Sequence, residues 1–132
     1  MIKKMITKLP IKEMLKFLVG GGSAVLVDAV VYVILKMYLD ISLAKVISYI
    51  AGAIVGFIIN KIWTFASKKF KWLEIVKYIF LYAFSASVNT LVNKLVLFII
   101  PSVVFAFLCA TGVSTVINYI GQKFVVFRKV KL

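Results

Sequence analysis

The chain has 132 residues, of which 64% are hydrophobic, and its formal net charge is +13. A mean hydropathy of +1.09 excludes an ordinary soluble domain and indicates an integral membrane protein. The basic residues flank apolar stretches and form no polar domain of their own, so we expect no nucleic acid partner.

Four apolar stretches follow one another along the chain, at residues 17–36, 43–65, 75–99 and 103–127. Each has about the 20 residues that a helix needs to cross a bilayer, and none alternates as the strands of a transmembrane barrel do. The sequence therefore predicts an all-α integral membrane fold with four transmembrane helices in a single domain, residues 1–132. The first stretch is too long for the apolar core of a signal peptide, and we expect it to be retained.

Basic residues gather before the first stretch, between the second and third, and after the fourth. The connection around Pro101 and Ser102 has no charge, whereas the first connection holds Lys36, Asp40 and Lys45. The positive-inside rule therefore predicts that both termini and the middle connection are cytoplasmic. The basic residues on this predicted side are Lys3, Lys4, Lys8, Lys12, Lys16, Lys61, Lys68, Lys69, Lys71, Lys77, Arg128, Lys129 and Lys131.

The two halves of the chain resemble each other when one is shifted along the other by 61 or 62 residues. The matching positions are 16–18 with 77–79, Asp28 with Asn89, and 60–65 with 122–127. Each half holds two stretches, so both halves would enter the membrane in the same sense. The sequence therefore predicts two parallel helical-hairpin repeats, at about 16–70 and about 75–132, with an axis along the membrane normal.

Small or polar residues recur at every fourth position of the second and fourth stretches. These residues are Ala44, Ser48, Gly52 and Gly56 in the second stretch, and Ala106, Ala110, Ser114 and Asn118 in the fourth. Small residues at this spacing line one helix face and let another backbone come close. We expect tight helix packing along both faces, and a homo-oligomer, most simply a dimer, because these faces can also serve contacts between subunits.

Polar residues also interrupt the first and third stretches. Asp28 lies about eleven residues past the start of its stretch, roughly 16 Å along a helix and near the bilayer midplane. A carboxylate there costs about 2.5 to 3.5 kcal/mol on insertion scales, so it needs a partner or a watered cavity. We expect an intramembrane polar path made of Asp28, Asn89, Asn93 and Lys94. Lys94 is a candidate partner of Asp28, with snorkelling to the outer headgroups as its alternative, and a purely structural hydrogen bond is the alternative for Asp28.

A second polar group lies where the second and fourth stretches end and the first and third begin. Ammonium groups attract phosphate, and amides add hydrogen bonds, so this group predicts a site for a phosphate or a lipid headgroup. Its members are Lys16, Asn60, Lys61, Lys77, Asn118, Gln122 and Lys123. The alternative is ordinary anchoring at the interface with an aromatic belt, formed here by Trp63, Trp72, Tyr78 and Phe124.

Groups for catalysis or metal binding are scarce in this sequence. The chain has no histidine, and its one cysteine, Cys109, lies inside the fourth stretch. An intramolecular disulfide is therefore excluded, and we expect no metal and no cofactor. The sequence shows no nucleophile beside a base and no phosphate-binding loop for ATP, so we do not expect an enzyme.

The opening FLVGGGSAVLVDAVVYVIL and the ending NKIWTF, in this order within paired hairpins, resemble the GtrA-like family over about 120 residues. The family motif reads here Asn60, Lys61, Trp63 and Phe65, and the second copy has Gln122 and Val125 where Asn and Trp are usual. The resemblance implies movement of a polyprenyl-phosphate-linked monosaccharide across the cytoplasmic membrane, for glycosylation of cell-surface polysaccharide or teichoic acid.

The leading hypothesis is thus a small lipid-linked-sugar translocase in contact with membrane lipid and its polyprenyl-phosphate-linked sugar. An alternative is a non-transporting scaffold that recruits or stabilises a membrane glycosyltransferase. A small multidrug exporter is disfavoured, because strong lysine asymmetry fixes one orientation and repels cationic drugs.

Overall fold

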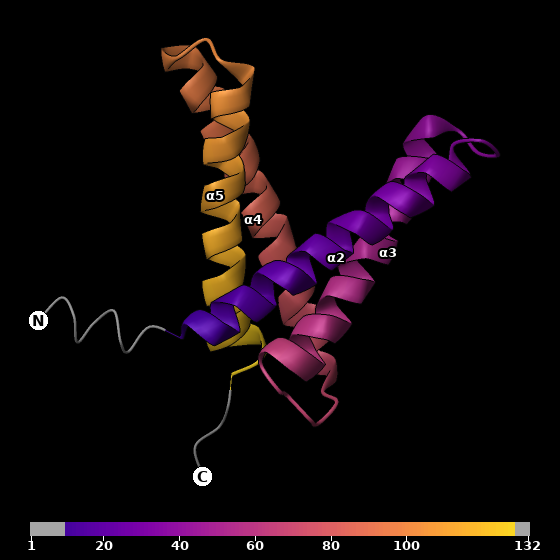
Figure 1. Ribbon diagram of the computed structural model, residues 1–132, viewed down its shortest axis with the longest axis vertical. Helices are drawn as coiled ribbons and strands as arrows, with labels where there is room; N and C mark the ends of the chain where they lie inside the picture. Colours follow the sequence, from indigo (N-terminus) through magenta and orange to yellow (C-terminus); the bar gives the residue numbers. More distant parts are fainter. Residues whose placement is uncertain (1–9, 129–132) are drawn as a thin grey trace, which may run out of the picture. The chain divides into compact units, whose positions relative to one another are not determined.

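The computed structural model of the protein describes residues 10–128. Within these residues every regular element is helical (Figure 1). The elements are α2 (Ile11–Leu35), α3 (Ile41–Ile59), η1 (Asn60–Thr64), α4 (Trp72–Ile99), α5 (Val103–Gly121) and η2 (Gln122–Val126), where η marks a π-helical turn. The basic residues of the topology prediction that lie outside the described residues are Lys3, Lys4, Lys8, Lys129 and Lys131.

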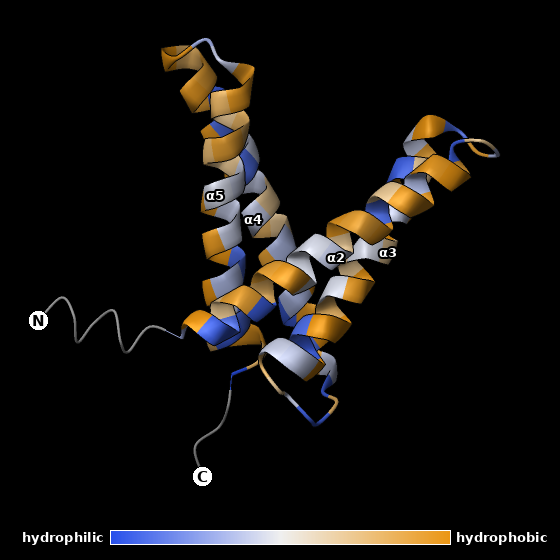
Figure 2. Cartoon of the chain, in the orientation of Figure 1, coloured by the Kyte–Doolittle hydropathy of each residue, from blue (hydrophilic) through white to orange (hydrophobic). Residues whose placement is uncertain are grey.

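Four helical segments of the described chain are long and apolar enough to cross a membrane, namely Ile11–Leu35, Ile41–Thr64, Trp72–Ile99 and Val103–Val126. Figure 2 shows hydrophobic residues along much of each of them. The predicted fold class, an all-α membrane protein with four spanning helices, is confirmed. The parallel repeat within it stays a prediction.

Local signals in the sequence set where the helices begin. α2 begins after Pro10, six residues before the predicted apolar stretch, because Lys12 and Glu13 are good helix formers. Asp40 caps α3, where its side chain accepts the Ser42 N–H at 3.2 Å. Such caps satisfy backbone donors that the first helical turn leaves unpaired.

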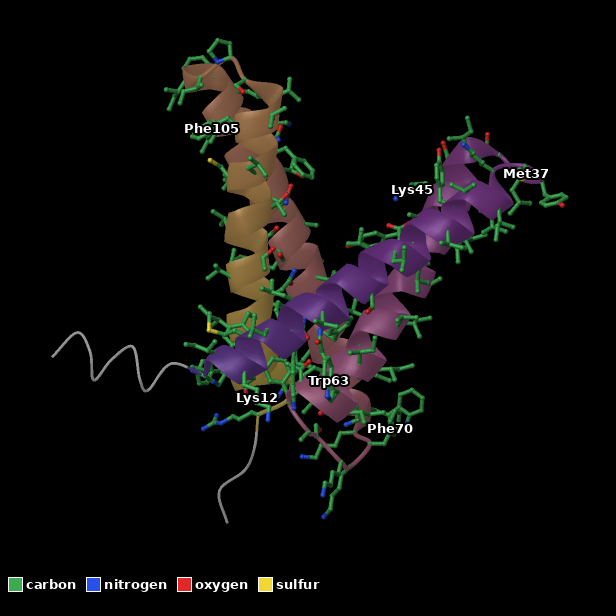
Figure 3. All side chains as sticks on the ribbon, viewed as in Figure 1. Lys12, Met37, Lys45, Trp63, Phe70 and Phe105 are labelled. Atoms are coloured by element: carbon green, nitrogen blue, oxygen red, sulfur yellow. The ribbon has the colours of Figure 1, made fainter. Side chains whose placement is uncertain are left out.

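The chain divides between Lys68 and Lys69 into two compact units. Unit 1 contains α2, α3 and η1, and unit 2 contains α4, α5 and η2. Each unit is a hairpin of two helices that pack side by side, followed by its π-helical turn. In Figure 3, Met37 and Lys45 lie at the connection end of unit 1, and Trp63 lies at the opposite end.

The interface between α2 and α3, called here the seam of unit 1, depends on small residues of α3. Ala44, Ser48, Gly52 and Gly56 are all buried, which confirms the predicted packing face. A Cβ atom at Gly52 would lie 2.6 Å from the backbone oxygen of Ala24. The two helices of unit 1 therefore approach so closely here that only glycine fits.

At one equivalent position of the helix–helix interface, the two units place a small and a large residue on opposite helices. In unit 1 the small residue is Gly20 of α2, where an added Cβ would lie 3.2 Å from the Cγ2 atom of Ile59. In unit 2 the small residue is Gly121 of α5, and an added Cβ would collide with the side chain of Leu81. Each hairpin thus pairs one glycine with one large aliphatic residue, but the helix that supplies the glycine differs.

Candidate functional site

Unit 1 ends in the π-helical turn η1, which holds three buried polar residues, Asn60, Lys61 and Thr64. The turn closes with a bond from the Phe65 N–H to the Asn60 carbonyl oxygen at 2.9 Å, five residues back. The ring of Phe65 packs on that of Phe17 in α2 at 6.2 Å between centroids. Single π-helical turns often occur at functional sites, because they turn side chains away from the positions of a regular α-helix.

The Asn60 amide lies against α2 and has a partner within its own turn. Its Oδ1 atom accepts a hydrogen bond from the Thr64 hydroxyl at 2.9 Å, and the pair is buried. A Cβ atom at Gly20 would lie 2.5 Å from this oxygen, so a larger residue there would displace the Asn60 amide. A Cβ atom added at Gly21 or Gly22 would meet no atom within 4 Å. Of the three consecutive glycines, only Gly20 is explained by a close contact.

Replacing Thr64 with valine tests the Asn60 contact. The change keeps the shape of the side chain but removes the donor to Oδ1, and a buried acceptor without a donor is costly. We expect Thr64→Val to lower thermal stability in detergent by about 1 kcal/mol. The matched control is Thr90→Val, because the Thr90 hydroxyl is exposed and bonds only the Ala86 carbonyl of its own helix. Equal stability of the two variants would contradict the prediction.

Two lysines lie at the same end of unit 1 as Asn60. The Lys61 side chain is 8% exposed, and its Nζ atom donates to the Ser67 hydroxyl at 3.0 Å. The Lys16 Nζ atom lies over the Trp63 ring, 5.4 Å from its centroid. The structure thus brings Lys16, Asn60 and Lys61 to one end of unit 1, where two ammonium groups and an amide lie together.

Unit 2 ends in a second π-helical turn, η2. Its closing bond runs from the Phe127 N–H to the Gln122 carbonyl oxygen at 2.8 Å. The Lys77 Nζ atom of α4 donates to the Val125 carbonyl at 3.3 Å, and the Lys123 Nζ atom lies 5.5 Å from the centroid of the Phe124 ring. Lys77, Gln122 and Lys123 therefore share one end of unit 2.

The amide of Gln122 differs from that of Asn60. Gln122 is fully buried, at 0% exposure, and neither Nε2 nor Oε1 has a hydrogen-bond partner among the described residues. The same holds for the buried Oδ1 atom of Asn118, one helical turn earlier on α5. Most buried polar atoms in proteins are paired, so three such atoms on neighbouring turns are unusual.

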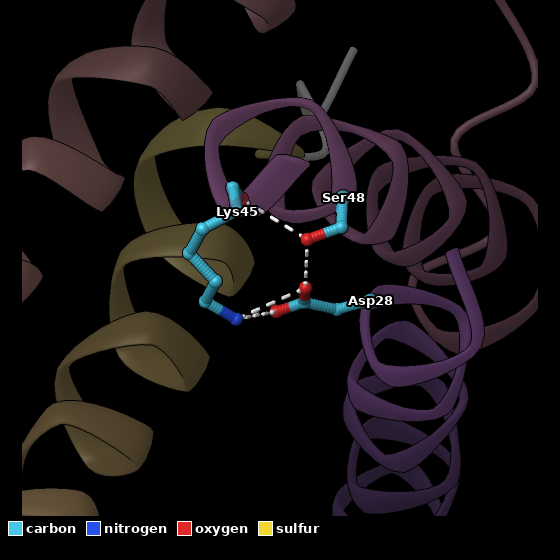
Figure 4. A network of polar contacts seen from close by, with 3 residues as sticks. All are labelled: Asp28, Lys45 and Ser48. Carbon is cyan, nitrogen blue, oxygen red and sulfur yellow. Dashed lines mark hydrogen bonds and ion pairs between the residues drawn. The ribbon is translucent and has the colours of Figure 1, made fainter. Parts of the chain in front are cut away.

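Asp28 forms a polar cluster between α2 and α3, in the half of unit 1 nearer to their connection (Figure 4). The Lys45 Nζ atom of α3 lies 3.1 Å and 3.0 Å from its two carboxylate oxygens, and the Ser48 hydroxyl donates to Oδ1 at 2.7 Å. The Asp28 side chain is 19% exposed and the Lys45 side chain 56%. The structure therefore gives Asp28 a different partner from the predicted Lys94.

Asp28 is also displaced from the middle of its helix. The central residue of α2 is Ser23, and Asp28 lies five residues beyond it, about 7.5 Å nearer to the connection with α3. The depth of Asp28 in the bilayer stays a prediction, whereas its place along α2, nearer to the connection with α3, is described. This position lets the long Lys45 side chain reach the carboxylate from the first turn of α3.

Lys45 and Ser48 were not among the predicted site residues. A signal for the second contact was available, since Asp28 and Ser48 are each ten residues from Tyr38 in the connection. Residues equally far from the turn of a helical hairpin face each other. Lys45 follows from the same register, because it precedes Ser48 by nearly one turn of α3.

The counterpart of Asp28 in unit 2 makes a neutral contact. The Asn89 amide Nδ2 donates to the Ser114 hydroxyl at 3.0 Å, and the Ser85 hydroxyl donates to the Ser114 carbonyl at 3.2 Å. Asn93 is half-buried one turn further along α4, and Lys94 beside it is exposed. Asp28 and Asn89 thus both face the partner helix of their own hairpin.

A family model described as GtrA/DPMS, transmembrane domain, matches residues 16–127. The matched segment covers α2 from residue 16 onward, the other three spanning helices and both π-helical turns. It also contains every predicted site residue, from Lys16 to Lys123. The chain is a multi-pass membrane protein that belongs to the GtrA/DPMS transmembrane domain family.

Proposed function

We propose that this protein moves a polyprenyl-phosphate-linked monosaccharide across the cytoplasmic membrane, for glycosylation of cell-surface polysaccharide or teichoic acid. Family membership supports the broader part of this proposal, a membrane function related to polyprenyl-phosphate sugars. The finer part, transbilayer movement of the sugar, rests on the polar groups of the two units.

One observation carries the proposal: each unit gathers an amide and two lysines at the end that bears its π-helical turn. These groups are Lys16, Asn60 and Lys61 in unit 1, and Lys77, Gln122 and Lys123 in unit 2. Lysine binds phosphate as a point charge, and an amide adds directional hydrogen bonds. Repetition of this combination in both units favours a headgroup site over simple anchoring.

Unit 1 also offers an apolar surface beside its basic end. A shallow groove there is lined by Val19, Ser23, Ile58, Ile59, Ile62 and Trp63. The Lys16 ammonium lies over the ring of Trp63, which is part of this lining. A lipid phosphate near Lys16 would therefore have its prenyl chain next to apolar side chains.

Polar side chains within the spans support passage of the sugar. Hydroxyl groups in hydrocarbon without partners cost several kcal/mol each at the high end, so a sugar needs polar contacts along its route. We assign this role to Asp28 in unit 1 and to Asn89, Asn93 and Lys94 in unit 2. The first two of these already hold hydrogen-bonding partners from the facing helix, so the contacts would be exchanged during transport.

The orientation of the protein follows from its charge. The ends that carry the π-helical turns also carry the middle basic connection, from Lys61 to Lys77, and the start of α2. The opposite connections carry few charges or none. We therefore place both termini and both π-helical turns on the cytoplasmic side.

Reconstitution into liposomes tests the proposal. Vesicles with a polyprenyl-phosphate hexose are treated with an impermeant reagent that oxidises sugar diols, and the fraction protected over time is followed. We expect the protein to speed exposure of the inner lipid, and Lys61→Ala combined with Lys123→Ala to slow it at least about tenfold, through lost charged hydrogen bonds. Lys36→Ala, at the opposite end of unit 1, is the matched control. A rate equal to that of empty vesicles would overturn the proposal.

The scaffold alternative predicts a different outcome. Under that reading the protein co-purifies with a membrane glycosyltransferase, and the activity of the enzyme survives Asp28→Ala and Lys61→Ala. A dimer is compatible with either reading, and chemical cross-linking in native membranes measures it.

A further inference from the structure

The two π-helical turns carry the same pattern with one difference. In each, an amide residue opens the turn, a lysine follows it, and a β-branched residue lies four positions after the amide. That β-branched residue is Thr64 in unit 1 and Val126 in unit 2. Threonine has a hydroxyl that donates to the amide oxygen of Asn60, whereas valine has only methyl groups.

The difference changes the state of the two amides. The Oδ1 atom of Asn60 has its donor within its own turn. Gln122 is fully buried, yet both of its polar atoms are unpaired among the described residues. Since both atoms lack partners, exchange of the nitrogen and oxygen positions of the amide would leave this conclusion unchanged.

Asn118 extends the unpaired group by one helical turn. Its Oδ1 atom is buried and also unpaired among the described residues. Asn118 lies in the last turn of α5, four residues before Gln122, which begins η2. Leaving buried polar atoms without hydrogen bonds destabilises a protein. Three such atoms lie at one place, whereas in unit 1 the equivalent amide oxygen accepts a bond from Thr64. The unpaired atoms of unit 2 therefore point to a ligand that provides the missing bonds.

The chemistry of the three atoms selects the ligand group. Two of them, Asn118 Oδ1 and Gln122 Oε1, are acceptors and need a donor. An ionised phosphate offers only acceptors, so it does not satisfy them. A hydroxyl group donates and accepts, and neighbouring hydroxyls of a sugar ring match two acceptors and one donor. The lysines at the same end, Lys77 and Lys123, are the groups suited to phosphate.

We propose that Asn118 and Gln122 of unit 2 bind the sugar hydroxyls of the lipid-linked substrate, and that the corresponding Asn60 of unit 1 does not contact the sugar. This inference rests on the proposed function and refines it, because it separates sugar recognition from phosphate recognition. It also assigns the two units different tasks.

The test compares lipids with and without a sugar. Purified full-length protein in nanodiscs is titrated with bare polyprenyl phosphate and with polyprenyl-phosphate glucose, galactose, mannose and N-acetylglucosamine. We expect at least one of the four sugars to strengthen binding about tenfold or more over the bare phosphate, since each hydrogen bond contributes about three- to tenfold.

Two variants at the site should remove the preference for a sugar by different routes. Gln122→Leu deletes the polar atoms of the amide. Val126→Thr gives unit 2 a hydroxyl equivalent to that of Thr64, which donates to the amide oxygen of Asn60 in unit 1. We expect both to reduce the ratio between the affinities for the sugar-bearing and the bare lipid to about one. We also expect Val126→Thr to melt at a higher temperature than wild type without lipid. Val116→Thr, the same change at an exposed position of α5, is the control and keeps the full ratio.

The outcomes separate the two proposals. If neither lipid binds and no transport occurs, the proposed function fails and this inference falls with it. If both lipids bind but no sugar improves affinity, or the ratio survives in both folded variants, the function stands and the sugar site is wrong. If Val126→Thr raises the melting temperature but leaves the ratio of lipid affinities unchanged, water alone satisfies the amides in the wild type. That outcome also overturns the inference.

Discussion

Replacing Gly52 with leucine is expected to prevent stable packing of unit 1. An added Cβ would lie 2.6 Å from the Ala24 carbonyl oxygen and 3.1 Å from the Asp28 Cβ atom. The first obstacle is backbone, so α2 must move away from α3 along the seam. Overpacking costs about 1 to 3 kcal/mol where side chains can adjust, and we expect at least the upper value here.

The matched control for this variant is Gly22→Leu. Gly22 lies on α2, and a Cβ there meets nothing within 4 Å. Both changes replace a helical glycine with the same apolar residue, so helix propensity and hydrophobicity change equally. The measurement is the melting temperature in detergent together with the fraction of monodisperse protein by size exclusion. Equal behaviour of the two variants would show that the α2–α3 contact is not as close as described.

Removing the partner of Asp28 is expected to have the second large effect. Lys45→Met keeps a long side chain over Tyr32 but leaves the carboxylate with the Ser48 hydroxyl alone. An unpaired carboxylate at the centre of a span costs about 2.5 to 3.5 kcal/mol. Asp28 lies off centre, and Lys45 is more than half exposed and partly screened, so we expect about 2 kcal/mol.

A double variant separates charge from packing in this cluster. Asp28→Asn combined with Lys45→Met removes both charges and keeps a hydrogen-bonding group opposite Ser48. We expect it to recover most of the stability that Lys45→Met alone loses, and a double-mutant cycle measures the coupling. Additive effects of the two single changes would mean that the ion pair of Figure 4 contributes nothing to folding.

The sequence was sufficient for those parts of the fold that depend on local pattern. Four apolar stretches predicted four spanning helices, and the fourfold spacing from Ala44 to Gly56 predicted the buried face of α3. Both follow from hydrophobicity and helical periodicity, which are properties of single segments.

The details of the candidate site depend on register between helices, which is not a local property. Lys45 was predicted only as a residue of the connection, whereas the packed hairpin brings its ammonium to Asp28. The π-helical turns were missed because one additional residue in a turn leaves no mark in the hydropathy pattern. The contact of Thr64 with Asn60, and its absence at Val126, were missed as well, because hydropathy does not show which polar atoms a buried side chain bonds.

The opposite placement of glycine in the two seams bears on how the chain assembles. All four helices enter the same lipid, where apolar surface alone does not distinguish one neighbour from another. If α2 paired with α5, Gly20 would meet Gly121 and leave a void. If α4 paired with α3, Leu81 would meet Ile59 and the helices would be forced apart. We therefore expect each glycine to favour its own hairpin partner over the other, since a wrong pairing leaves a void or a clash.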